Sequence, residues 1–224
     1  MATATFNDRM DAMWEERFAQ EGYLFGTEPV PFLLKHDKHF AKGQSVLSIA
    51  EGEGRNGVHL AKKGLSVTGV EFAPSAVAKA NKLATLNKVD VAFVQSDLFE
   101  WSWPYNTFDI TLGLFFQFVG PVERDILWQK MLDATSPGGL IAIHGYTPKQ
   151  LEFGTGGPPY MENMYTKESF NSVFHDCDTL VSEEYEAEQK SGSAHVGMSA
   201  LVDFIARKPI ETALFQAQSN RRSY

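Results

Sequence analysis

The stretch S-V-L-S-I-A-E-G-E-G-R-N-G, residues 45–57, decides the fold of this 224-residue chain. An apolar run from Val46 to Ile49 predicts a buried strand, and apolar residues at helical spacing follow from Val58. Between them, three glycines are spaced as G-x-G-x-x-G. Glycine permits a tight turn and a close approach of backbone to ligand, so the pattern predicts a nucleotide-binding turn between a strand and a helix.

The carboxylates around this turn indicate which nucleotide binds. Glu71 lies nineteen residues after Gly52, at the end of the next predicted strand, where it can accept hydrogen bonds from a ribose. Such a site serves nicotinamide dinucleotides and S-adenosylmethionine. Glu51 and Glu53 would repel a pyrophosphate but attract the ammonium and sulfonium groups of S-adenosylmethionine. We therefore expect S-adenosylmethionine as the cofactor.

A further carboxylate follows the third predicted strand, in Ser96-Asp97-Leu98. Asp97 can accept a hydrogen bond from the adenine amino group while Leu98 covers the ring. Alternatively, Asp97 caps the helical turn that follows it.

The remaining pattern predicts an α/β fold, a Rossmann-like doubly wound sheet. We expect strands at 45–50, 66–71, 91–95, 108–114 and 139–144 and helices at 55–63, 74–86 and 121–135. Strands joined by single helices make a parallel sheet with helices on both faces. Strands at 178–187 and 195–206, joined by a turn at 190–193, add a C-terminal antiparallel hairpin.

We expect one domain at 1–208 and a tail at 209–224 without a convincing pattern. The domain divides into a helical lid at 1–40, with helices at 7–20 and 29–40, a cofactor-binding core at 45–146, and a substrate loop and closing hairpin at 147–208.

Local signals mark several boundaries. The turn Ser136-Pro137-Gly138-Gly139 ends a helix and starts the fifth strand, and residues 147–165 form a Gly/Pro-rich loop. Thr166 caps a helix through Phe174, with Glu168 or Ser169 in its first turn, and Pro74 suits the first turn of its helix.

Composition narrows the possible partners. The formal charge of −8 and the pI near 5.3 argue against a nucleic-acid partner. Cys177 is the only cysteine, so a disulfide framework is not expected. The sequence has no apolar signal core and no run long enough to span a bilayer, so we expect a cytoplasmic protein without a membrane partner.

The run V-L-S-I-A-E-G-E-G-R-N-G-V-H-L-A-K-K-G-L-S-V-T-G-V-E, residues 46–71, resembles the first two motifs of class I S-adenosylmethionine-dependent methyltransferases. W-E-E-R-F, Y-L-F-G-T-E-P and H-V-G-M-S-A-L-V-D-F look most like the small bacterial tellurite-resistance and thiopurine methyltransferase-like group. The resemblance implies the class I methyltransferase fold. Ser48 stands where that family has an acid, and Ala50 where it has its first glycine. Glu51 is the expected substitute for that acid, with Glu53 in reserve.

The resemblance also implies that Trp14 and Phe25, eleven residues apart, contact the cofactor as part of a lid that excludes water. Alternatively, Trp14 anchors its helix to the core. The full set of expected cofactor-binding residues is Trp14, Phe25, Ala50, Glu51, Gly52, Glu53, Gly54, Asn56, Glu71, Phe72, Asp97, Leu98 and Leu114.

We expect methyl transfer to a small-molecule acceptor such as a thiol, a chalcogen oxyanion or a heterocycle. The predicted acceptor pocket is aromatic, formed by residues 114–118 and 144–146 and covered by Tyr160 and Met161. His144 is the candidate catalytic base or, alternatively, a structural histidine. Histidines with metal-ligand spacing are lacking, so a metal is not expected. The alternatives are a nicotinamide-dependent oxidoreductase and a non-catalytic cofactor-binding regulator.

Overall fold

The computed structural model describes residues 6–210, apart from the side chains of residues 6–11 and His195. Within these residues, seven strands form one sheet in the order β3-β2-β1-β4-β5-β7-β6. The parallel part consists of β1 (Ser45–Ile49), β2 (Ser66–Glu71), β3 (Ala92–Gln95), β4 (Phe108–Leu114) and β5 (Thr135–Tyr146). The strands β6 (Asp178–Ser191) and β7 (His195–Arg207) complete the sheet, and β7 is antiparallel to both of its neighbours. The predicted fold class is confirmed.

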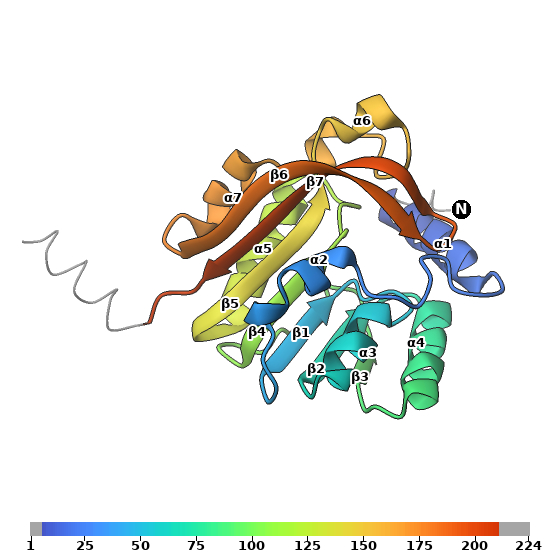
Figure 1. Ribbon diagram of the computed structural model, residues 1–224, viewed down its shortest axis with the longest axis horizontal. Helices are drawn as coiled ribbons and strands as arrows, with labels where there is room; N and C mark the ends of the chain where they lie inside the picture. The colour runs from blue at the N-terminus through green and yellow to red at the C-terminus, as the bar shows by residue number, and fades with distance from the viewer. Residues whose placement is uncertain (1–5, 211–224) are drawn as a thin grey trace, which may run out of the picture.

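Helices cover both faces of the sheet (Figure 1). The elements α5 (Pro121–Ala134) and α7 (Lys167–Phe174) cover one face, and α2 (Pro31–Lys35) and α3 (Arg55–Lys62) cover the other. The helix α4 (Pro74–Asn87) starts with its proline in the first turn, as predicted. Thr166 and Ser169 form a capping box at the start of α7, which confirms the predicted cap.

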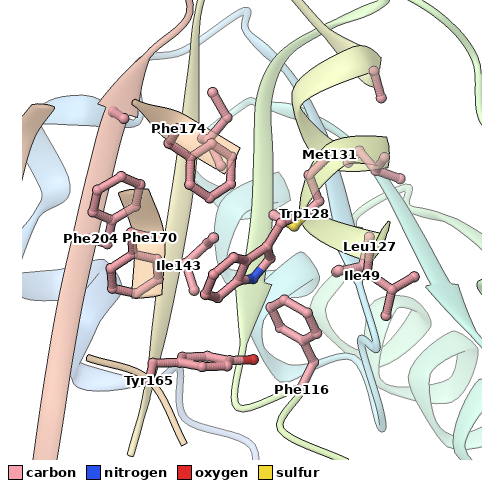
Figure 2. Close-up of a cluster of buried hydrophobic side chains, with 14 of the residues drawn as sticks. Ile49, Phe116, Leu127, Trp128, Met131, Ile143, Tyr165, Phe170, Phe174 and Phe204 are labelled. Carbon is pink, nitrogen blue, oxygen red and sulfur yellow. The ribbon is translucent and has the colours of Figure 1, made fainter. Parts of the chain in front are cut away.

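Trp128 of α5 is the centre of the larger core cluster (Figure 2). Its ring centroid lies 5.3 Å from that of Tyr165, 5.0 Å from that of Phe170 and 5.7 Å from that of Phe174. The ring of Phe170 also stacks on that of Phe204 in β7 at 4.2 Å, so aromatic packing holds α5 and α7 together and against the sheet.

The N-terminal segment differs from the prediction at its second helix. The first helix, α1 (Phe6–Ala19), agrees with the sequence pattern. The single helix expected over 29–40 is wrong, because α2 ends at Lys35 and a short 3-10 turn, η1 (Asp37–His39), follows it. The helix ends where the ring of His36 turns inward and forms a hydrogen bond with Asp203 of β7.

Two predicted turns are misplaced. Residues 136–139 were expected to separate a helix from the fifth strand, but β5 already begins at Thr135. Gly138 bends the backbone with φ +79°, yet its N–H still bonds the carbonyl of Lys208, so the segment stays paired as an irregular part of the strand. The hairpin turn lies at 192–194 rather than 190–193, because β6 continues through Ser191.

The segment 147–165 contains two short helical elements that were not predicted, α6 (Gln150–Phe153) and η2 (Met161–Asn163). Buried Gln150 organises it, since its side chain accepts a hydrogen bond from Ala200 N and donates to Thr155 Oγ1 and the Gly156 carbonyl. No helix among residues 6–210 combines the length and the apolar character that crossing a membrane requires.

Candidate functional site

The glycine turn lies at the carboxyl edge of the sheet, between β1 and α3. Its backbone takes left-handed φ values at Ala50 (+47°), Gly52 (+63°) and Gly54 (+88°). The surroundings of Gly54 and Gly52 differ. A Cβ at Gly54 would lie 2.7 Å from the Cβ of Ala80, so Gly54 permits α4 to pack closely. A Cβ at Gly52 would meet only Phe18, at 3.7 Å, which leaves space beside the turn.

Glu51 is folded back into the protein. Its carboxylate accepts hydrogen bonds from Gly57 N, at 2.6 Å, and from the Ser48 hydroxyl. Burial raises the pKa of Glu51 to about 7, although these hydrogen bonds oppose the shift. Ser48, which stands where the resembled family has an acid, is thus a hydrogen-bond partner of Glu51.

Glu53 is also buried and paired. It accepts hydrogen bonds from Leu24 N at 2.7 Å and from Lys79 Nζ at 2.8 Å. Asn56, another predicted cofactor residue, accepts a hydrogen bond from Val30 N at 3.0 Å. Both side chains therefore fasten the N-terminal segment to the turn in this structure.

Glu71, at the end of β2, borders the space beside Gly52. Its two carboxylate oxygens accept hydrogen bonds from Gly52 N at 2.9 Å and from Ala73 N at 3.0 Å. Burial raises its pKa, and the backbone donors oppose the rise. Each carboxylate oxygen has a second lone pair, so the group is oriented and can still accept hydrogen bonds from a ligand.

Aromatic rings cover this turn. The rings of Trp14, Phe18 and Phe25 form a triangle, with centroids 5.6 Å apart for Trp14 and Phe18, 6.2 Å for Trp14 and Phe25, and 6.4 Å for Phe18 and Phe25. Half-buried Phe72 packs against the same cluster. Trp14 Nε1 is buried and has no hydrogen-bond partner among the described residues. The structure thus brings predicted residues from three other parts of the sequence, Trp14, Phe25, and Glu71 with Phe72, beside the turn at Gly52.

The remaining predicted cofactor residues, Asp97, Leu98 and Leu114, lie outside this aromatic cluster. Asp97 Oδ1 accepts a hydrogen bond from Phe99 N at 2.7 Å, so Asp97 caps the turn that follows β3. Leu98 packs in the core with Ile49 and Val70, and Leu114 packs in the core on the opposite face of the sheet.

The register of the sheet places His144 near the carboxyl edge, where the glycine turn also lies. Leu114, the last residue of β4, is the neighbour of His144, and His144 in turn is the neighbour of Asp203. His144 is only 1% exposed, and its ring lies 4.7 Å from that of Phe115 and 5.3 Å from that of Phe32. Phe115 has φ +57°, an uncommon backbone conformation for a non-glycine residue.

Asp203 is a functional candidate that the sequence analysis missed. It is fully buried and accepts four hydrogen bonds, from Lys35 Nζ at 2.9 Å, His36 Nε2 at 2.8 Å, His144 Nδ1 at 2.7 Å and Tyr185 Oη at 3.1 Å. Burial alone would raise the pKa of Asp203, but these donors lower it well below its ordinary value. A lone acid within the apolar strand A-L-V-D-F was the available signal.

His36, Glu183 and Asp203 also have the spacing of three metal ligands. Lys35 Nζ lies 2.7 Å from Glu183 and 2.9 Å from Asp203, so an ammonium group already balances this charge. A divalent ion would have to displace it, and the arrangement fits an ion-pair network better than a metal site.

The acceptor pocket differs from the prediction. Phe116 points into the core beside Trp128 and Tyr165 rather than lining a pocket (Figure 2). Gln117 is also structural, because its side chain bonds both backbone groups of Tyr146. An apolar cluster of Tyr146, Met164 and Leu201, with Phe115 and Tyr185 against it, lies beneath the β6–β7 hairpin.

Arg55 is a second residue that the sequence analysis missed. It follows Gly54 directly, is buried, and donates from Nη1 to the Phe25 carbonyl at 2.8 Å. Burial lowers the pKa of its guanidinium to about 10, against the attraction of Glu51 and Glu53. A buried positive charge therefore accompanies the acidic turn.

Comparison with known proteins finds methyltransferases that are similar to this chain. Residues 46–139 match the family model described as "Methyltransferase domain". A 65-residue segment of the chain is 45% identical to part of the 23S rRNA (uracil(747)-C(5))-methyltransferase of Pyrococcus abyssi. The matched segment makes up 29% of this chain and 16% of that relative. The chain thus matches about a sixth of that relative's length.

Solved structures share the fold over more of the chain. One, described as "Conversion of a Disulfide Bond into a Thioacetal Group during Echinomycin Biosynthesis", has a TM-score of 0.73 at 14% identity and covers 98% of this chain and all of that one. TehB from Haemophilus influenzae has a TM-score of 0.64 at 16% identity and covers 80% of this chain and 62% of that one. These likenesses show the fold, and the family match over residues 46–139 supports the predicted methyltransferase class and its cofactor, S-adenosylmethionine.

Proposed function

Because the chain has the class I S-adenosylmethionine-dependent methyltransferase fold and a methyltransferase domain at 46–139, we propose that it methylates a small molecule. The observation that carries this proposal is the aromatic cluster of Trp14, Phe18 and Phe25 over Gly52, with the oriented carboxylate of Glu71 at the same edge. In this arrangement Glu71 would bind the ribose hydroxyls, and the rings would exclude water from the sulfonium.

The proposed acceptor is a small group with a proton to lose, such as a thiol or a heterocyclic N–H. The apolar cluster beneath the hairpin, which includes Tyr146 and Met164, supports a small apolar acceptor. The description of the echinomycin structure names the conversion of a disulfide bond into a thioacetal group, which is consistent with sulfur as the acceptor atom. The chain's charge of −8 disfavours a nucleic-acid acceptor, although the matched curated relative acts on RNA.

We propose His144 as the general base. Asp203 is ionised and bonds Nδ1, so the proton of neutral His144 resides on Nδ1 and Nε2 is the basic nitrogen. The acceptor atom would attack the methyl carbon, the carbon–sulfur bond would break with its electron pair left on sulfur, and Nε2 would take the acceptor's proton. Access to His144 requires movement of the Phe115 ring that covers it.

Calorimetric titration with S-adenosylhomocysteine tests the cofactor site. Gly52→Ala should weaken binding strongly, since it introduces a side chain at φ +63° beside the ligand. Gly43→Ala is the matched control, because Gly43 has φ +90° and nothing within 4 Å of its added Cβ. No binding by the natural chain, or equal losses in both variants, would contradict the proposal.

Transfer of a labelled methyl group to a panel of thiols, chalcogen oxyanions, heterocycles and RNA tests the acceptor. Methylation of a small thiol or heterocycle is the expected result. Cofactor binding without any transfer would favour a non-catalytic regulator, and transfer to RNA alone would replace the small-molecule proposal. The family match already argues against a nicotinamide-dependent oxidoreductase.

A further inference from the structure

Residues 23–27, here called the strap, cross the glycine turn without regular secondary structure. Buried charged groups of the turn hold one side of the strap. Glu53 accepts the hydrogen bond of Leu24 N at 2.7 Å, and Arg55 donates to the Phe25 carbonyl at 2.8 Å. The Arg55 guanidinium also lies 5.6 Å from the centroid of the Phe25 ring. This side of the strap is therefore anchored by charge-assisted hydrogen bonds away from water.

The other side of the strap contacts the hairpin tip, residues 192–194. Ser193 N donates to the Leu24 carbonyl at 3.0 Å. Gly192 has φ +59°, and a Cβ there would lie 2.3 Å from that same carbonyl oxygen. The two backbones thus meet with no room for a side chain, and Figure 1 shows the end of the β6–β7 hairpin reaching across the sheet edge toward α1.

The hairpin tip also meets the segment after α6. A Cβ added at Gly156 would lie 3.4 Å from the carbonyl oxygen of Ala194. The hydroxyl of Thr155 bonds the carbonyl of Met198. Three segments distant in sequence therefore join above the carboxyl edge of the sheet, where Gly52 and Glu71 lie.

The two sides of the strap differ in exposure. Glu53 and Arg55 are buried, whereas Gly192 and Ser193 are exposed. Exposed backbone hydrogen bonds at a hairpin turn open more readily than buried charge-assisted ones. The hairpin tip is consequently the side of the contact that can separate while the strap stays on the turn.

We propose that the strap and the hairpin tip form a clasp that opens to exchange the cofactor. In this arrangement Glu53 and Arg55 are positioning residues, which keep Phe25 over the turn while the hairpin tip lifts. The inference rests on the proposed function only in placing S-adenosylmethionine beside Gly52.

A disulfide that locks the clasp tests the proposal. Leu24→Cys with Ser193→Cys, in a Cys177→Ser background, joins two residues whose backbones are already bonded. The oxidised protein should bind and release S-adenosylhomocysteine roughly tenfold more slowly than the reduced protein, and reduction should restore both rates. The control pair Glu188→Cys with Met198→Cys links neighbours within the hairpin only and should leave the rates unchanged.

A wedge gives the opposite perturbation and does not depend on disulfide formation. Gly192→Val would place a side chain against the Leu24 carbonyl and hold the hairpin tip away, so exchange should become faster. Gly43→Val is the control for a strained glycine position far from other atoms. Unchanged exchange rates in both the locked and the wedged protein would overturn the clasp.

The role of Arg55 has its own readout. Arg55→Gln should raise the dissociation rate of S-adenosylhomocysteine, and Arg55→Lys should raise it less, because lysine, unlike glutamine, keeps a positively charged donor for the Phe25 carbonyl. A shift in thermal unfolding with unchanged dissociation would assign Arg55 a structural role alone. Failure of the natural chain to bind would instead contradict the proposed function, and calorimetry separates the two results.

Discussion

Glu51 makes the stability of this protein depend on pH in a direction opposite to that of an ordinary paired carboxylate. Its carboxyl group is buried at the glycine turn, and its pKa rises from 4.5 to about 7. The native state therefore binds a proton at pH values where the unfolded chain has already lost it. Stability is greatest below the unfolded pKa and falls as the pH rises through the folded pKa.

The magnitude follows from the shift. A difference of 2.5, from 4.5 to about 7, corresponds to about 3 kcal/mol at 1.36 kcal/mol per unit. Glu51→Gln removes the titration but keeps an acceptor for Gly57 N. The free energy of unfolding of the natural protein, minus that of Glu51→Gln, should therefore decrease by about 3 kcal/mol between about pH 4 and about pH 8.

Urea unfolding at a series of pH values measures this difference directly. Other titrating groups are common to both proteins and largely cancel in the subtraction. Glu152→Gln, which removes an exposed carboxylate from α6, controls for the change in net charge. A difference that stays flat or increases with pH would refute the argument that burial dominates the ionisation of Glu51.

Three further outcomes are expected. Glu71→Gln should weaken S-adenosylhomocysteine binding by about 2 kcal/mol, roughly 30-fold, because it removes a charged acceptor, and calorimetry measures the loss. Asp203→Asn should cost about 3 to 5 kcal/mol in urea unfolding, since four donors lose an ionised partner, and an unchanged midpoint would contradict this. Trp128→Ala should cost about 3 to 5 kcal/mol by the same measurement because its ring is fully buried, whereas Val122→Ala, at an exposed position of α5, should have little effect.

The sequence predicted the sheet well because its signals are local. The strands predicted at residues 66–71 and 108–114, with valines in the first and Phe108, Ile110, Leu112 and Leu114 alternating in the second, have the same bounds in the structure. The errors arose where distant contacts decide. The inward turn of His36 toward Asp203 ends α2 early, and the pairing of Gly138 with Lys208 keeps a bent segment within β5.

The difference between local signals and distant contacts also explains which site residues could be predicted. The turn and Glu71 were predictable from spacing, and they meet at one edge because parallel strands end there. The partners of Glu51 and Glu53 were not predictable, since Ser48, Lys79 and Leu24 reach them only in the folded chain. The sequence predicts that both acids attract the cofactor's positive groups, whereas in this structure both accept hydrogen bonds from protein groups.

The position of β6 at the edge of the sheet has a consequence for self-association. A long edge strand exposes unpaired backbone groups that can recruit a second copy of the same strand. In β6, Glu184, Glu186 and Glu188 alternate along one exposed face. Two such strands paired edge to edge would bring like charges together, so the acidic face guards the open edge against growth of the sheet from one molecule into the next.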